Sequence, residues 1–390
     1  MQKTSRIILT ITFVLFLSVS LVTCVGGVGL YLWARQDGLN PIKAISLRIS
    51  LTRNEDALNT PAGVDPSYQE FVVNSGESAT LIAGRLQQQG LISDVDLFVD
   101  YVEYYGLAGQ LEAGTFYLQQ TMTIEGIAYA LTDASTATIA YRTLAGWRLE
   151  EIAEETIATN PLLDFTAAEF YNAVGPGVQI PADFRARMGI PELLSTGVAP
   201  SLEGFMYPGD YKLRPGITPQ ELADTLLLAF DTAITDEMLQ QAAQQGLTMY
   251  QVVTLAAIVQ REAVVVDEAP LIASVYLNRL SSSMRLDADP TVQYAIGFRD
   301  GRWWPRLSGE PDYYALGGAQ ANYAYNTYLM EDGLPLEDLL PPGPICSPGM
   351  AAIRAVLAPA QTEYLYFRSC DDRSHIFSTT LAEHSSITCP

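Results

Sequence analysis

The chain has 390 residues, 48% of them hydrophobic, and a formal net charge of −22. This length allows two or three domains with packed cores, and the acidic surface repels nucleic acid, which we therefore exclude as a partner. With only two histidines, His375 and His384, and no Cys/His spacing typical of a metal site, we expect neither a metal nor another cofactor.

The first element in chain order is an uncharged stretch of 28 residues, 7–34. It is longer than the ~20 residues that span a bilayer as a helix, and Tyr31 and Trp33 lie where interfacial aromatic residues are common. A cleaved signal peptide is the alternative, but its apolar region would cover only ~7–15 residues. We predict a single-pass transmembrane anchor, with residues 1–6 in the cytoplasm and the remainder outside the cytoplasmic membrane.

The next region is predicted to be a juxtamembrane connector, residues 35–66, followed by a small α+β module, residues 67–135. Hydrophobic periodicity, caps and breakers predict its elements. These are a strand at Glu70–Asn74, a helix from the cap Ser78 through Gln89 that ends at Gly90, a helix at Leu97–Tyr105, a strand at Gly114–Leu118 and a helix at Ile124–Leu131.

The strand–helix–helix–strand order of this module resembles the lysin motif, which binds the glycan of peptidoglycan. The resemblance is carried by FVVNSGESATLIAGRLQQQGLI followed by LEAGTFYL. The alternative is a structural module that only separates the catalytic domain from the membrane, and no single residue in 71–131 distinguishes the two. We expect a connecting segment at 136–200 and a mixed α/β catalytic domain at 201–390, so the fold class is α+β.

A helix predicted over residues 248–264 contains the most informative side chain. Leu255, Ile258, Val259 and Glu262 fall at i, i+3, i+4 and i+7, which places Glu262 on the apolar stripe. Desolvation and the C-terminal end of the helix dipole both raise the pKa of such a carboxyl group. A glutamate that stays protonated near neutral pH is suited to general acid catalysis. The alternative is a buried structural partner of Arg279 or Arg285.

Six motifs of the C-terminal part occur in a fixed order. They are LEGFMYPGDYKL, AAIVQREA, LNRLSSSMRLDADPTVQYAIG, YNTYLMEDGLP, PPGPICSPG and HIFSTTLAEH. Together they resemble the endolytic murein transglycosylases, the MltG/YceG-like family, over roughly Phe71–His384. The resemblance implies a membrane-anchored lyase that cleaves the MurNAc–GlcNAc β-1,4 bond within nascent peptidoglycan strands. Peptidoglycan is then the substrate, and cell-wall synthases are candidate partners.

The family motif assigns roles position by position. It usually has an acidic residue, a basic residue and a Glu in succession, which here correspond to Gln260, Arg261 and Glu262. Glu262 therefore matches the catalytic Glu, whereas Gln260 removes any assisting carboxylate. The upstream segment that usually reads Pro-Glu-Gly before an aromatic residue is Leu144-Ala-Gly-Trp147, which puts any role of that Glu in doubt.

One carboxyl group is enough for a lytic transglycosylase, because the substrate's own C6 hydroxyl closes onto C1 to give a 1,6-anhydroMurNAc end. Glycoside hydrolases generally need two carboxyl groups. Asp289 could be the second one, but we favour it as the cap of a helix at Thr291–Ile296. A water-using muramidase and a non-catalytic glycan-binding scaffold are the alternative functions.

Further candidates come from the same motifs. An Asn flanked by tyrosines suits an acetamido group, and Glu203 is either a supporting partner or a helix-start acid. The predicted substrate-binding residues are Glu203, Tyr207, Asp289, Thr291, Tyr294, Tyr325, Asn326 and Tyr328.

The remaining expectations concern the C-terminal region. We expect both histidines to be structural, because the sequence places no acid–base partner beside them. Residues 298–321 either flank the glycan groove or form a packed loop. Cys370 and Cys389 can form a disulfide if this region is extracytoplasmic.

Overall fold

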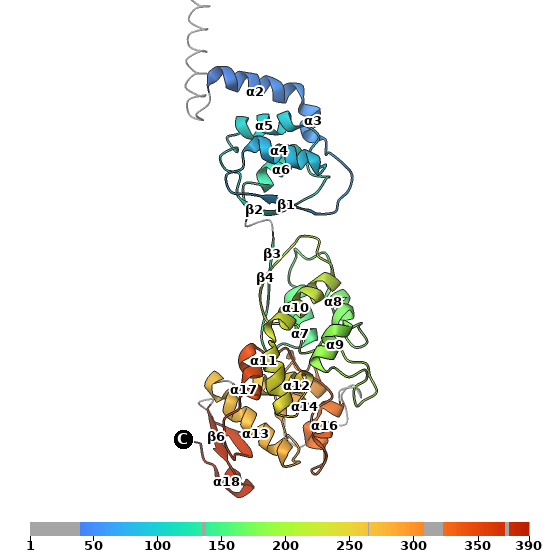
Figure 1. Cartoon of the computed structure of the whole chain (residues 1–390), viewed down its shortest axis with the longest axis vertical. Helices are drawn as coiled ribbons and strands as arrows, with labels where there is room; N and C mark the ends of the chain where they lie inside the picture. The colour runs from blue at the N-terminus through green and yellow to red at the C-terminus, as the bar shows by residue number, and fades with distance from the viewer. Residues whose placement is uncertain (1–39, 135–137, 264, 308–322, 371–373, 390) are drawn as a thin grey trace, which may run out of the picture. The chain divides into compact units, whose positions relative to one another are not determined.

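The computed structural model describes residues 40–134, 138–263, 265–307, 323–370 and 374–389. The chain divides into two compact units with a mixed α+β fold, and the second unit begins at Ala140 and excludes only Arg214–Gly216 (Figure 1). Within the described ranges, no helix combines the length and apolarity needed to cross a membrane. The predicted anchor, residues 7–34, lies outside the described residues.

The first unit is built on a two-stranded sheet covered by helices. Strand β1 pairs antiparallel with β2, and Phe71 lies opposite Phe116. Both phenylalanines are buried in a core shared with the helices, because alternate strand residues face one side of a sheet. The predicted strand–helix–helix–strand order is confirmed. The elements are β1 (Gln69–Val73), α4 (Ala79–Gln88), α5 (Val95–Tyr104), β2 (Gly114–Leu118) and α6 (Ile124–Ala130).

The caps of α4 are those that the sequence indicates. The Ser78 side chain accepts the Leu81 N–H, and Gly90 follows the helix with a φ of +71°. The predicted connector is largely helical, with α2 (Pro41–Arg53) and α3 (Glu55–Asn59). Helix α2 packs on α5, and its Leu51 belongs to the core of the first unit.

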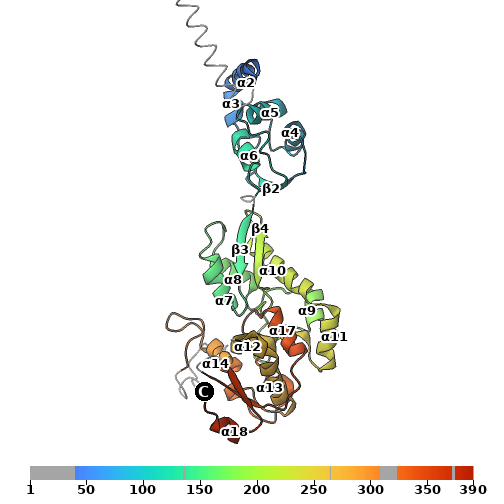
Figure 2. The same ribbon diagram turned by 90° about the vertical axis from the view of Figure 1, so that its left-hand side faces the viewer.

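The second unit is organised around helix α12 (Met249–Glu262). Most of its residues from Met249 to Val259 are buried, and it packs against helices α13, α14 and α17 (Figures 1 and 2). Thr248 and Gln251 form a capping box that fixes its start. The other elements are β3 (Ile139–Thr143), α7 (Leu149–Ile152), a π-helical turn (Ala153–Ile157), α8 (Ala167–Val174), α9 (Ala182–Met188), β4 (Gly209–Leu213), α10 (Pro219–Ala233), α11 (Asp236–Gln244), α13 (Ala269–Ser281), α14 (Asp289–Ile296), α16 (Leu336–Leu339), α17 (Met350–Leu357), β5 (Tyr366–Ser369), β6 (His375–Ser378) and α18 (Leu381–Ser386).

Two small antiparallel features complete this unit. Strand β3 pairs with β4, and β5 pairs with β6, with Ser369 opposite His375. A disulfide joins Cys370, directly after β5, to Cys389, beyond α18, which confirms the pairing expected as possible from the sequence. Strand β5 and the C-terminal segment are therefore held together covalently. Most of the connecting segment expected at 136–200, from residue 140 onward, lies within this compact unit.

Candidate active site

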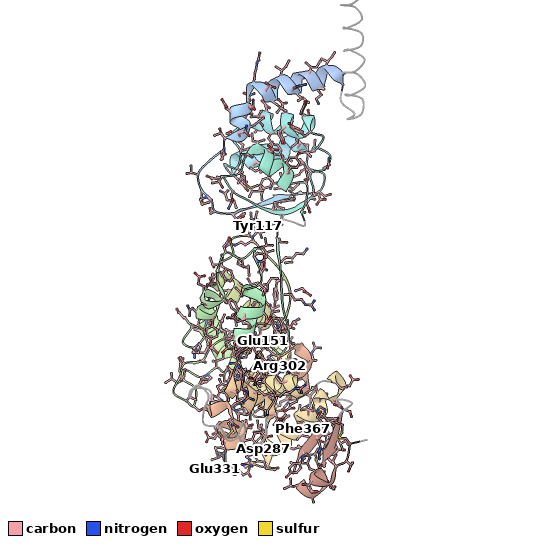
Figure 3. All side chains as sticks on the ribbon, turned by 180° about the vertical axis from the view of Figure 1, so that it is seen from behind. Tyr117, Glu151, Asp287, Arg302, Glu331 and Phe367 are labelled. Atoms are coloured by element: carbon pink, nitrogen blue, oxygen red, sulfur yellow. A yellow bond between two sulfur atoms is a disulfide. The ribbon has the colours of Figure 1, made fainter. Side chains whose placement is uncertain are left out.

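A cavity of about 690 Å³ opens in the second unit at the C-terminal end of α12. Its walls come from α12, α13, the start of α14, strands β5 and β6, and helix α18. Figure 3 labels two of its lining residues, Asp287 and Phe367, in this part of the molecule. The lining residues are Glu262, Tyr276, Arg279, Leu286, Asp287, Asp289, Tyr328, Tyr366, Phe367, Arg368, Ser369, His375, Leu381, His384 and Ser385.

Glu262 is the last residue of α12 and lines this cavity. The Tyr276 hydroxyl, from α13, donates to Glu262 Oε1 at 3.0 Å. Burial raises the pKa of Glu262 to about 7, and the charge of Asp289 adds to this effect, while the Tyr276 hydrogen bond and Arg261 oppose it. The carboxyl group can thus hold a proton near neutral pH and give it up, as general acid–base catalysis requires. The sequence did not indicate Tyr276, because it is simply an aromatic residue on the apolar face of another helix.

The arginine partners considered for Glu262 have a different role. Arg279 Nη1 lies 3.3 Å from Asp287 Oδ2, and Arg285 Nε lies 2.8 Å from Asp287 Oδ1. Both arginines therefore pair with Asp287. The structural alternative for Glu262, a buried ion pair with one of them, is wrong.

Asp289 also faces the cavity, and its predicted role as a helix cap is wrong. Helix α14 begins at Asp289 itself, its N-cap residue is Ala288, and no side chain caps it. Instead, the Tyr328 hydroxyl donates to Asp289 Oδ1 at 2.9 Å. The contact spans 39 residues, so it could not be deduced from the local pattern. Of the predicted substrate-binding residues, only Asp289 and Tyr328 line this cavity.

Four other predicted sugar-binding residues are buried and do not line this cavity. Thr291 is fully buried and shares a hydrogen bond of 2.9 Å with Thr327. Asn326 accepts the Tyr328 N–H, and the rings of Tyr294 and Tyr325 pack with centroids 4.8 Å apart. These residues position the cavity rather than line it. Tyr207 contacts Phe230 and lies outside the lining.

Glu203 is a supporting residue rather than an exposed helix-start acid. Its Oε2 accepts the Leu149 N–H at 3.2 Å and the Tyr294 hydroxyl at 3.4 Å. Burial, and then the nearby Glu150, raise the pKa of Glu203 to about 8. The Arg148 guanidinium stacks on the Tyr294 ring at 4.0 Å and donates to its carbonyl. This buried cluster therefore holds α14, whose first residue is Asp289.

The two histidines line the cavity, and His375 has the acid–base partner that the sequence did not reveal. His375 Nδ1 lies 2.7 Å from Glu268 Oε2, a contact across 107 residues. His384 stacks on the Tyr366 ring, with the ring centroids 5.5 Å apart.

Gln260, which departs from the family motif, makes a structural hydrogen bond in this protein. Gln260 Oε1 accepts the Gly349 N–H at 2.9 Å, and Arg261 donates to the Gly146 carbonyl. Gly146 has a φ of +86°, and a Cβ added there would lie 3.2 Å from Arg261 Nη1, so any larger residue would be strained and crowded. The altered upstream segment thus serves to pack against the residues beside Glu262.

Two tryptophans in the described part of the 298–321 insertion pack against other segments. The Arg261 guanidinium lies 3.9 Å from the Trp304 ring, and Trp304 Nε1 donates to Glu151 Oε2 at 2.9 Å. The Arg148 guanidinium lies 5.4 Å from the centre of the Trp303 ring. The packed alternative therefore fits Trp303 and Trp304, whereas Phe298 is exposed and residues 308–321 lie outside the described residues.

Comparison with known proteins places this geometry in a family. The sequence model of the YceG-like family matches residues 71–388. The endolytic murein transglycosylase of Bacillus subtilis is 26% identical over 320 residues, covering 80% of this chain and 82% of that protein. The Streptococcus pneumoniae protein of the same name is 24% identical over 318 residues. The match covers 78% of this chain but only 55% of the Streptococcus pneumoniae protein.

A solved structure agrees with these matches. The crystal structure of a YceG-like protein from Listeria monocytogenes superposes with a TM-score of 0.52 at 25% identity, covering 83% of this chain and 99% of that one. Since the family match extends from the first strand of the small module to the C-terminal segment, the chain belongs to the YceG-like family.

Proposed function

We propose that this protein is a peptidoglycan lyase, an endolytic murein transglycosylase, with Glu262 as its general acid and base. The observation that carries the proposal is a single carboxyl group with a pKa of about 7 in a cavity at the end of a buried helix. The name of the relatives from Bacillus subtilis and Streptococcus pneumoniae supports the same reaction.

The proposed reaction follows from the hydrogen bonding of Glu262. Because Tyr276 donates to Oε1, Oε2 is the oxygen free to carry the acidic proton. Glu262 gives this proton to the glycosidic oxygen as the bond from MurNAc C1 breaks. The carboxylate then takes the proton of the MurNAc C6 hydroxyl while that oxygen bonds to C1. No water is consumed, and the strand ends in 1,6-anhydroMurNAc.

Asp289 supports a second candidate, a muramidase that uses water. Its carboxylate lines the same cavity, and its charge raises the pKa of Glu262, so the two groups are close enough to interact. Paired carboxyl groups are what a hydrolase requires. We favour the lyase because Oδ1 of Asp289 already accepts a hydrogen bond from Tyr328, which suits charge stabilisation of an oxocarbenium-like centre.

The products decide between these reactions. Full-length protein in detergent should be incubated with uncrosslinked glycan strands in water enriched in ¹⁸O. We expect products one water lighter than hydrolysis fragments, no heavy oxygen at the new ends, and multi-disaccharide pieces early in the digest. Heavy oxygen in the new ends would establish hydrolysis, and single disaccharides from the outset would exclude internal cleavage. Glu262→Gln should lower the rate by at least ~10²-fold.

We also propose that residues 7–34 anchor the protein in the cytoplasmic membrane and that the 67–135 module binds glycan. The uncharged stretch and the strand–helix–helix–strand order support these two roles. In this arrangement the catalytic unit acts on strands outside the membrane.

A further inference from the structure

One wall of the cavity is formed by strand β5 and helix α18, which the Cys370–Cys389 disulfide holds together. Tyr366 and Arg368 are two residues apart on β5, so they project from the same face. The Tyr366 ring contacts His384 of α18 and lies 5.1 Å from the Arg279 guanidinium. We call Tyr366, Arg368 and His384 the β5–α18 wall.

The two arginines at this wall differ in how many of their donors are used. Arg279 is buried and donates to the carbonyls of Leu365, Arg285 and Leu286 as well as to Asp287. Arg368 is exposed, and its one hydrogen bond to a described residue is from Nη1 to the Ile387 carbonyl at 3.3 Å. A guanidinium has five N–H donors, so Arg368 keeps a fork of donors for a ligand.

The charges around the cavity make Arg368 the group that can attract an anion. Arg279 and Arg285 both pair with Asp287, so a carboxylate of the protein already occupies the donors that each of them turns toward it. Burial, Arg368 and Arg279 lower the pKa of His384, which favours the uncharged form of its ring. Arg368 has no ion pair with any described residue. In a chain of net charge −22, an anionic ligand is repelled elsewhere, so a local cation is needed to hold it.

We propose that Arg368 binds a carboxylate of the peptide that branches from the muramic acid residue being cleaved. This inference rests on the proposed function and adds a specificity determinant to it. A planar guanidinium can bind a carboxylate through two parallel hydrogen bonds. The peptide leaves the sugar close to the bond that Glu262 protonates, so it must pass a wall of this cavity, and the β5–α18 wall offers the matching charge.

The test compares Arg368→Gln with the unaltered protein on two preparations of glycan strands. One carries its natural peptide carboxylates, and in the other these groups are converted to amides. For the anionic strands we expect KM to rise roughly 3–10-fold in the variant, the range of one partly exposed charge-assisted hydrogen bond. For the amidated strands we expect the two proteins to have the same KM. The matched control is Arg354→Gln, which removes an exposed arginine from α17 outside the cavity and should change neither value.

The outcomes separate this proposal from the proposed function. Equal loss on both substrates, or no loss on either, would overturn the role of Arg368 while cleavage by the unaltered protein still stood. No cleavage of any strand by the unaltered protein would instead overturn the proposed function. Strands stripped of peptide, which bear a lactyl carboxylate on the sugar, identify the source. A variant effect confined to peptide-bearing strands assigns the contact to the peptide. An equal effect on stripped strands, whose lactyl carboxylate is freed only when the peptide is removed, would show that Arg368 binds any carboxylate near the sugar and would overturn the assignment to the peptide.

Discussion

At the scale of single residues, two neighbours of Glu262 act on it in opposite directions. The charge of Asp289 disfavours ionisation of Glu262, whereas the Tyr276 hydroxyl stabilises the ionised form. A general acid that must also act as a base needs a pKa near the working pH, and these opposed effects, together with burial, place the pKa of Glu262 at about 7.

This balance predicts how the rate depends on pH. Since the acid must be protonated, kcat/KM on glycan strands should fall about tenfold per pH unit above pH about 7. Asp289→Asn removes the charge that raises the pKa of Glu262, so the midpoint of this fall should move to lower pH. The control Glu337→Gln removes an exposed acid of α16 and should leave the midpoint in place. A midpoint that does not move in Asp289→Asn would contradict this electrostatic coupling, and complete loss of activity at every pH would show that Asp289 takes part in the reaction itself.

The raised pKa of Glu262 also predicts a pH-dependent stability. The native state binds more protons than the unfolded chain between the ordinary value of 4.5 and about 7. The contribution of Glu262 to stability is therefore present at low pH and lost as the pH rises through 7. Glu262→Gln should gain stability relative to the unaltered protein over this window, by up to about 3 kcal/mol. Urea unfolding at pH 4.5 and pH 8 measures it, and an equal difference at both values would exclude a raised pKa.

At the scale of elements, the position of α14 depends on the buried cluster beneath it. Arg148 is almost completely buried, pairs with Glu150 at 2.7 Å and stacks on Tyr294 of α14. Arg148→Met should destabilise the second unit by about 2–4 kcal/mol, because it leaves Glu150 without its partner. The matched control is Arg142→Met, which removes an exposed pair with Asp210 and should cost less than roughly 1 kcal/mol.

Tryptophan fluorescence during urea unfolding reports this difference selectively. Trp147, Trp303 and Trp304 all lie in the second unit, and the fourth tryptophan, Trp33, lies in the predicted anchor. If the two arginine variants lost the same stability, burial of the Arg148 cluster would not support α14.

The sequence predicts elements well where local chemistry determines them. Ser78 and Gly90 bound α4 as expected, and the apolar stripe of α12 leads to Glu262. Prediction fails where a distant partner decides the outcome. Asp289 is a residue type that often caps helices, but its carboxylate accepts a hydrogen bond from Tyr328, which lies in another segment. The buried tyrosines and Asn326 match a sugar-binding pattern in the sequence, but they do not line the cavity. Composition alone cannot show which face of a motif is enclosed.

At the scale of the whole molecule, the charge distribution and the proposed reaction are consistent with each other. The first 35 residues contain no acidic side chain, so all 44 acidic residues lie beyond them, in the part that we propose meets the cell wall. A surface of this charge does not bind anionic lipid by itself. The membrane attachment that we propose would therefore depend on the uncharged stretch, and the anionic substrate that we propose would be held by local groups such as Arg368.

The proposed attachment makes a prediction about topology. Protease added to intact spheroplasts should degrade the acidic part and leave a small membrane-bound stub containing residues 7–34, because that stretch is long enough to span the bilayer. Leu17→Lys combined with Leu21→Lys should weaken insertion, since each lysine near the centre of a span costs about 2.5–3.5 kcal/mol. Leu17→Ala with Leu21→Ala is the matched control and should remain attached. Full protection from protease would reverse the orientation, and release of a soluble unaltered protein that lacks residues 7–34 would show that the stretch is a cleaved signal peptide.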